Sequence, residues 1–185
     1  MNLIYLVDED FVNYKLPSMF VGFPHCTCKC DKEYGKVVCQ NNPLLNSPTI
    51  SITKEDLCER YINNPITSAI VIGGLEPMED DIYLISFIDC LRNKYNCDDP
   101  VVIYTGYTEQ ELESGWRDGR EGSESIFTNH WKSLISYKNI VIKFGRFIPD
   151  MPSKFDEVLG VKLASENQYA KEYNMQIWFF LKNIV

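Results

Sequence analysis

The sequence predicts an α/β fold organised around a parallel β-sheet. Short and almost continuously apolar runs recur along the 185 residues, stretches with helical patterning separate them, and glycine or polar residues follow most of the runs. Strands that are buried on both faces by crossover helices have this composition, whereas half-exposed strands alternate apolar and polar residues. The length corresponds to roughly one domain, and we expect a single domain over residues 1–185.

Each expected element has a local signal. The apolar runs predict strands over Ser18–Phe23, Ser68–Ile72, Val101–Tyr104 and Ile140–Phe144, with a further candidate over Leu159–Ala164. Helices are expected over Thr53–Tyr61, Asp80–Lys94 and Thr108–Ser114. The second of these is amphipathic, with apolar residues at Ile82, Ile85, Phe87, Ile88 and Leu91. The third begins with a capping box, in which Thr108 is followed three residues later by Glu111.

Polar and glycine-rich segments follow the ends of the expected strands. They are the cysteine-containing loop after Phe23, Gly73–Pro77, Tyr104–Tyr107 and Lys143–Arg146. Ligands of parallel α/β sheets bind at the C-terminal ends of the strands. We therefore expect these four segments to converge on one rim that holds the functional site.

The charge balance excludes several classes of partner. Lys and Arg total 18 against 26 Asp and Glu, which gives a formal net charge of -8. An acidic chain gains nothing from phosphate counterion release or from anionic lipid, so neither nucleic-acid binding nor membrane-surface binding is expected. No targeting segment is recognisable, and no apolar run reaches the ~20 residues of a membrane span. These observations predict a cytoplasmic protein.

Seven cysteines are unevenly distributed. Cys26, Cys28, Cys30 and Cys39 lie close together, whereas Cys58, Cys90 and Cys97 are scattered and are expected to be buried apolar residues. Clustered thiolates bind zinc or an iron–sulfur cluster, and spacing alone does not separate these from reactive or structural thiols. The neighbouring His25 is either a further ligand or a positioning or surface histidine.

Four motifs, taken in order, resemble a known family. They are Cys39-Gln40-Asn41, Gly73-Gly74-Leu75-Glu76-Pro77, Tyr104-Thr105-Gly106-Tyr107-Thr108 and Ser165-Glu166-Asn167-Gln168. Between about Met19 and Gln168 the chain resembles the radical S-adenosylmethionine enzymes that activate anaerobic (class III) ribonucleotide reductases. The resemblance implies an open, partial parallel β/α barrel of about five or six strands.

The resemblance also implies a set of cluster ligands. Cys26, Cys30 and Cys39 match the three cysteines that hold a [4Fe–4S] cluster, although the second gap is eight residues, Asp31 to Val38, instead of two. Three thiolates leave one iron open for the amino and carboxylate groups of S-adenosylmethionine, and a fourth would close it. Cys28 is then an extra thiol, either a bystander or a replacement for Cys26 or Cys30.

Cofactor contacts follow from the same motifs. Gly73, Gly74 and Glu76 match the segment that binds the aminoacyl part, and Glu76 can accept from an ammonium group. The motifs further place Val38 against the adenine, Tyr104 and Thr105 near the ribose or aminoacyl group, and Asn167 with Gln168 near the cofactor. A tight turn, a strand terminus and a helix cap at Ser165 are the plainer alternatives for these segments. Phe144 stands where the family's D-G-x-F segment has Asp.

The implied activity is one-electron cleavage of S-adenosylmethionine to methionine and a 5′-deoxyadenosyl radical, which abstracts a hydrogen atom. The implied partners are the glycyl-radical large subunit of an anaerobic ribonucleoside-triphosphate reductase and an external one-electron reductant such as a flavodoxin. Two alternatives remain: a radical enzyme acting on a small molecule or peptide, and a non-catalytic zinc or iron–sulfur module. The polar insertion Gly115–Asn129 is either a solvated surface loop or a lid or partner-docking segment.

Overall fold

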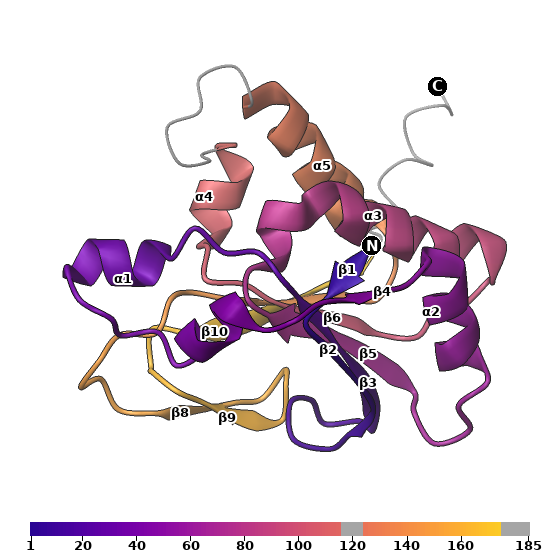
Figure 1. Ribbon diagram of the computed structural model, residues 1–185, viewed down its shortest axis with the longest axis horizontal. Helices are drawn as coiled ribbons and strands as arrows, with labels where there is room; N and C mark the ends of the chain where they lie inside the picture. Colours follow the sequence, from indigo (N-terminus) through magenta and orange to yellow (C-terminus); the bar gives the residue numbers. More distant parts are fainter. Residues whose placement is uncertain (116–123, 175–185) are drawn as a thin grey trace, which may run out of the picture.

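A six-stranded mixed sheet forms the centre of the molecule (Figure 1). The computed structural model describes residues 1–115 and 124–174. The strand order in the sheet is β10-β7-β6-β5-β3-β2. The four inner strands run parallel, and β2 and β10 pair antiparallel at the two edges. The predicted α/β class is therefore confirmed.

The strands are β1 (Asn2–Leu3), β2 (Tyr5–Asp10), β3 (Ser18–Phe23), β4 (Ile50–Ser51), β5 (Ala69–Gly74), β6 (Val101–Tyr104), β7 (Ile140–Phe144), β8 (Lys154–Asp156), β9 (Val161–Leu163) and β10 (Tyr169–Tyr173). The α-helices are α1 (Lys29–Tyr34), α2 (Lys54–Ile62), α3 (Asp81–Asp89), α4 (Glu109–Glu113) and α5 (Glu124–Ser136). Shorter turns are the 3-10 helices η1 (Asn42–Asn46) and η2 (Pro77–Asp80), and the π-helix η3 (Cys90–Lys94).

The parallel centre follows the apolar runs of the sequence. Strands β3, β6 and β7 have the predicted bounds, and β5 begins one residue later than expected. Every residue of β5 is buried, because both faces of the sheet are covered. Ile70 and Ile72 pack in the core beneath the helices, whereas Val71 packs in a second core on the opposite face.

Helices α2, α3 and α5 cover one face of the sheet (Figure 1). Thr53 caps α2 by accepting a hydrogen bond from the Asp56 N–H, and the capping box predicted at Thr108 is present. The predicted helix from Asp80 to Lys94 continues from α3 into the π-helical turn η3. Cys58, Cys90 and Cys97 are buried as expected.

The edges of the sheet differ from the expectation of parallel strands throughout. Neither β2 nor β10 was predicted: β2 ends in the acidic residues Asp8, Glu9 and Asp10, and β10 carries Lys171 and Glu172 and has no apolar run. An edge strand pairs on one side only, and its sequence is under weaker constraint than that of a buried strand. The candidate strand Leu159–Ala164 was wrongly placed: its β9 portion pairs with β8 in a separate two-stranded hairpin.

The β8–β9 hairpin and the β2–β3 connection lie on the face opposite the helices. Leu159, Leu163 and Tyr14 form the second core there, against Val71 and Val102 of the sheet. In the described part of the chain, no helix is both long and apolar enough to cross a membrane. Of the insertion predicted over Gly115–Asn129, residues 116–123 lie outside the described residues, and α5 starts at Glu124.

Candidate functional site

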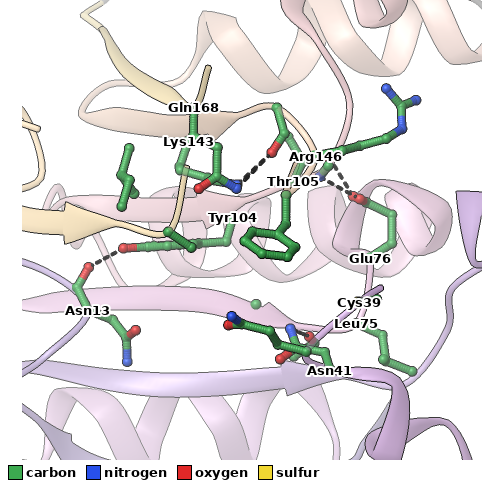
Figure 2. A pocket seen from close by; sticks show the side chains of 18 of the residues that line it. Asn13, Cys39, Asn41, Leu75, Glu76, Tyr104, Thr105, Lys143, Arg146 and Gln168 are labelled. Carbon is green, nitrogen blue, oxygen red and sulfur yellow. Dashed lines mark hydrogen bonds between the residues drawn. The ribbon is translucent and has the colours of Figure 1, made fainter. Parts of the chain in front are cut away.

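A cavity of about 410 Å³ opens at the C-terminal edge of the parallel strands (Figure 2). All four segments that were expected to converge contribute to its wall, which confirms that part of the prediction. The predicted site residues on this wall are Cys26, Cys30, Cys39, Gly73, Gly74, Glu76, Tyr104 and Thr105. The β2–β3 side and the β8–β9 hairpin close the cavity from the other directions, and Arg146 and Gln168 complete the rim.

Two predicted cofactor residues do not line the cavity. Val38 lies in the cysteine loop, where its backbone N–H donates to the Asp31 carboxylate. Asn167 donates from Nδ2 to the Arg146 carbonyl at 2.9 Å. Its neighbour Gln168 lines the wall and donates to the Gly145 carbonyl at 3.1 Å. The S-x-N-Q segment therefore fixes the turn after β7, and contact with the cavity comes from Gln168.

Three of the four clustered cysteines line the cavity, and the fourth, Cys28, does not. Cys28 has a left-handed backbone with φ of 56°, and its thiol donates towards the Cys26 carbonyl at 3.7 Å. Its own N–H donates to the Cys26 sulfur at 3.2 Å. Cys28 is absent from the cavity wall, which favours the interpretation of this residue as a bystander. His25 is held by Asp80 at 2.6 Å and is likewise not part of the wall.

Asp31 closes the eight-residue gap between the second and third cysteines. Helix α1 covers the first half of this gap, and the Asp31 carboxylate accepts from the N–H groups of Val38 at 2.8 Å and Cys39 at 3.0 Å. Because Asp31 directly follows Cys30, these bonds return Cys39 to the side of Cys30. The sequence analysis did not predict that Asp31 positions Cys39; the only local signal was an acidic residue directly after Cys30.

The three thiols differ in their affinity for protons. The Cys30 thiol donates a hydrogen bond to the Cys39 sulfur, and the backbone N–H groups of Asn41 and Asn42 donate to the same sulfur. Together these bonds lower the pKa of Cys39 to about 6. The bond to Cys39 and burial raise the pKa of Cys30. Burial raises the pKa of Cys26 to about 12. The bond from Cys30 therefore favours the thiolate form of Cys39, and thiolate is the form that binds metal.

The cysteines at the cavity are the type of ligand that an iron–sulfur cluster takes. Within the described residues, no three His, Cys, Asp or Glu side chains are arranged to hold one metal ion. A [4Fe–4S] cluster is held by cysteine thiolates. Cys26, Cys30 and Cys39 supply three such ligands on one wall, and Cys28 does not supply a fourth.

We expect Asp31→Ala to weaken iron retention by about 10- to 100-fold, the usual effect of removing a group that orients a metal ligand. Asp31→Asn is the matched control, because its amide oxygen can still accept from Val38 and Cys39. Iron released to a chelator after anaerobic reconstitution measures the effect. Equal iron retention in wild type and Asp31→Ala would show that Cys39 is positioned without these bonds.

Glu76 ties the end of β5 to the end of β6. Its carboxylate accepts from the Thr105 hydroxyl at 2.6 Å and the Gly106 N–H at 2.8 Å (Figure 2). It also accepts from the Met78 N–H at 3.1 Å. Burial raises the pKa of Glu76 to about 7, although these hydrogen bonds oppose the shift. The side chain thus has a positioning role that the sequence did not reveal, and an additional bond to a ligand ammonium stays a prediction.

The predicted need for glycine at the end of β5 is visible in the backbone. Gly74 has φ of 88°, and a Cβ there would lie 2.9 Å from the Gly22 Cα. At Gly73, a Cβ would lie 2.9 Å from the Phe20 ring. Asn41 of the C-Q-N motif donates to the Gly74 carbonyl at 2.7 Å. The segment that carries Cys39 is therefore fastened to the glycine turn.

A charged network fastens the other side of the cysteine loop. Glu111 of α4 accepts from Lys29 and from Arg146, each at 2.8 Å. Burial alone would raise the pKa of Glu111, yet these two bonds lower it to about 2. Both cations also lie over the Tyr107 ring. The network joins α1, α4 and the end of β7 around the cavity.

No family model matches this chain, and comparisons with curated proteins and with solved structures find no match either.

Proposed function

We propose that the chain is a [4Fe–4S]- and S-adenosylmethionine-dependent radical enzyme that activates the glycyl-radical subunit of an anaerobic ribonucleoside-triphosphate reductase. The observation that carries the proposal is that Cys26, Cys30 and Cys39 share one cavity with the glycine turn of β5 and the end of β6. The finer fold within this proposal is an open, partial β/α barrel, of which β3, β5, β6 and β7 are the parallel strands.

The residues on the wall have distinct roles in this proposal. Cys26, Cys30 and Cys39 hold the cluster and leave one iron for the cofactor, while Cys28 stays outside. When bound, the cluster supplies the electron that cleaves S-adenosylmethionine. The backbone of Gly73 and Gly74, which lines the cavity, contacts the aminoacyl part, and the hydrogen bond between Thr105 and Glu76 holds the two strand ends together beside it.

The volume of the cavity supports a macromolecular hydrogen donor. About 410 Å³ is near the lower end of the range for a site that encloses one drug-sized ligand. S-adenosylmethionine, which is about the size of a drug molecule, would fill much of the cavity, so the hydrogen donor would approach from the rim. A glycine loop of a larger subunit suits such an approach, and a flavodoxin-like reductant would supply the electron from outside.

Anaerobic reconstitution with iron and sulfide tests the proposal. We expect the reduced protein to show an iron–sulfur electron paramagnetic resonance signal that changes when S-adenosylmethionine is added, because the cofactor binds the open iron. Cys39→Ala is the control and is expected to show neither the signal nor the change. A signal that is insensitive to S-adenosylmethionine would indicate a non-catalytic cluster module.

A further inference from the structure

Lys143 is a buried cation in the wall of the cavity (Figure 2). It is the one charged residue of β7, whose other residues are Ile140, Val141, Ile142 and Phe144. Its exposed fraction is 7%. Lysine is almost never this buried in a folded protein unless an anion pairs with it.

No carboxylate of the described chain forms an ion pair with Lys143. Its ammonium donates to the Gly145 carbonyl at 2.7 Å, and no carboxylate in residues 1–115 and 124–174 comes within salt-bridge distance. Glu76, the nearby buried acid, accepts from three other groups. Burial lowers the pKa of Lys143 to about 8, so the side chain is still mostly charged at neutral pH.

A buried ammonium with one hydrogen bond keeps two donors for a further acceptor. A buried charge without a carboxylate partner is costly, and an anionic group of a ligand would compensate it. Arg146 cannot take this role as readily, because Glu111 and Glu33 already engage its guanidinium. Lys143 is also close enough to Cys30 and Cys39 for their charges to affect it.

We propose that Lys143 binds the carboxylate of the ligand in this cavity. The inference rests on the proposed function, under which that carboxylate is the one of S-adenosylmethionine and its aminoacyl end lies beside the cysteines. Lys143 would hold the carboxylate by a charge-assisted hydrogen bond and so set the position of the aminoacyl end. The sequence motifs did not indicate this residue, because it precedes the position at which the family carries its polar side chain.

Lys143→Met is a suitable test variant because it leaves no buried polar group without a partner. The Gly145 carbonyl keeps its bond from Gln168. Removing an unpaired buried charge while keeping the volume is often neutral or stabilising, so the metal-free variant is expected to unfold at an unchanged or higher temperature. Lys162→Met is the matched control, since Lys162 also lines the cavity but is exposed to solvent.

The test compares S-adenosylmethionine with its decarboxylated analogue, by equilibrium dialysis against the reconstituted proteins. In wild type the cofactor is expected to bind more tightly than the analogue. In Lys143→Met this preference is expected to fall by about 10- to 150-fold, the value of a charge-assisted hydrogen bond. In Lys162→Met the preference is expected to change by no more than about fivefold, as for an exposed charge.

The outcomes separate this inference from the proposed function. If wild type retains a cluster and binds the cofactor, but Lys143→Met keeps the full preference for the carboxylate, the inference is wrong. The inference is also wrong if Lys143→Met weakens the binding of S-adenosylmethionine and of its decarboxylated analogue equally, because Lys143 then interacts with the cluster and not with the carboxylate. If wild type binds neither a cluster nor the cofactor, the proposed function itself fails, and the inference fails with it.

Discussion

Replacing Cys26, Cys30 or Cys39 by alanine is expected to abolish cluster binding, whereas Cys28→Ala is expected to retain it. Cys26, Cys30 and Cys39 line one cavity, whereas the Cys28 thiol donates towards the Cys26 carbonyl. Because thiolate ligation dominates cluster affinity, each lost ligand should reduce iron and sulfide to background after anaerobic reconstitution. The measurement is iron and sulfide per chain, with the absorbance of the cluster as a second readout.

Cys28→Ala is the internal control for this series, since it removes a thiol from the same loop. Its φ of 56° is left-handed, so any loss of thermal stability must be measured alongside iron content. An iron-free Cys28→Ala protein that is fully folded, beside an iron-containing Cys26→Ala protein, would reverse the assignment of the first ligand.

Glu76→Ala is expected to lower the free energy of unfolding of the metal-free protein by at least about 3 kcal/mol. The substitution leaves the N–H groups of Met78 and Gly106 and the hydroxyl of Thr105 without their acceptor, and each buried group that loses its partner costs about 1–3 kcal/mol. Urea unfolding measures the loss. Glu76→Gln keeps one acceptor oxygen and is expected to cost about 1–2 kcal/mol.

The same carboxyl makes stability depend on pH. Its pKa is raised from 4.5 in the unfolded chain to about 7 in the fold, so the folded state binds more protons between these values. Its contribution to stability is therefore fully present below pH 4.5 and is lost as the pH rises towards 7. Glu76→Gln should remove this part of the pH dependence. An unchanged pH profile in Glu76→Gln would show that other groups cause it.

The parallel centre of the sheet could be predicted because burial on both faces demands apolar residues throughout. Val101–Tyr104 and Ile140–Phe144 met this demand and were placed to the residue. The edge strand at Tyr169–Tyr173 could not be found in this way, because it carries Lys171 and Glu172 and has no apolar run. Its place in the sheet is set by pairing with β7, which is a long-range property.

The candidate site shows a similar division. The cysteines and the glycine turn follow from local motifs, and the structure gathers them at one cavity. Asp31 and Lys143 depend on contacts that no local motif encodes: a carboxylate that bridges a loop, and a lysine that is buried only when the sheet assembles. Val38 was expected at the adenine because it directly precedes Cys39; its N–H donates to Asp31, and its contact with the cofactor stays a prediction.

Formation of 5′-deoxyadenosine tests the central claim most directly. The reconstituted protein would be incubated anaerobically with S-adenosylmethionine and a chemical one-electron reductant, and 5′-deoxyadenosine and methionine would be quantified. We predict equal amounts of the two products in wild type and in Cys28→Ala, and neither in Cys39→Ala. A wild-type protein that holds a full complement of iron and sulfide, binds S-adenosylmethionine and yet forms no 5′-deoxyadenosine would contradict the account.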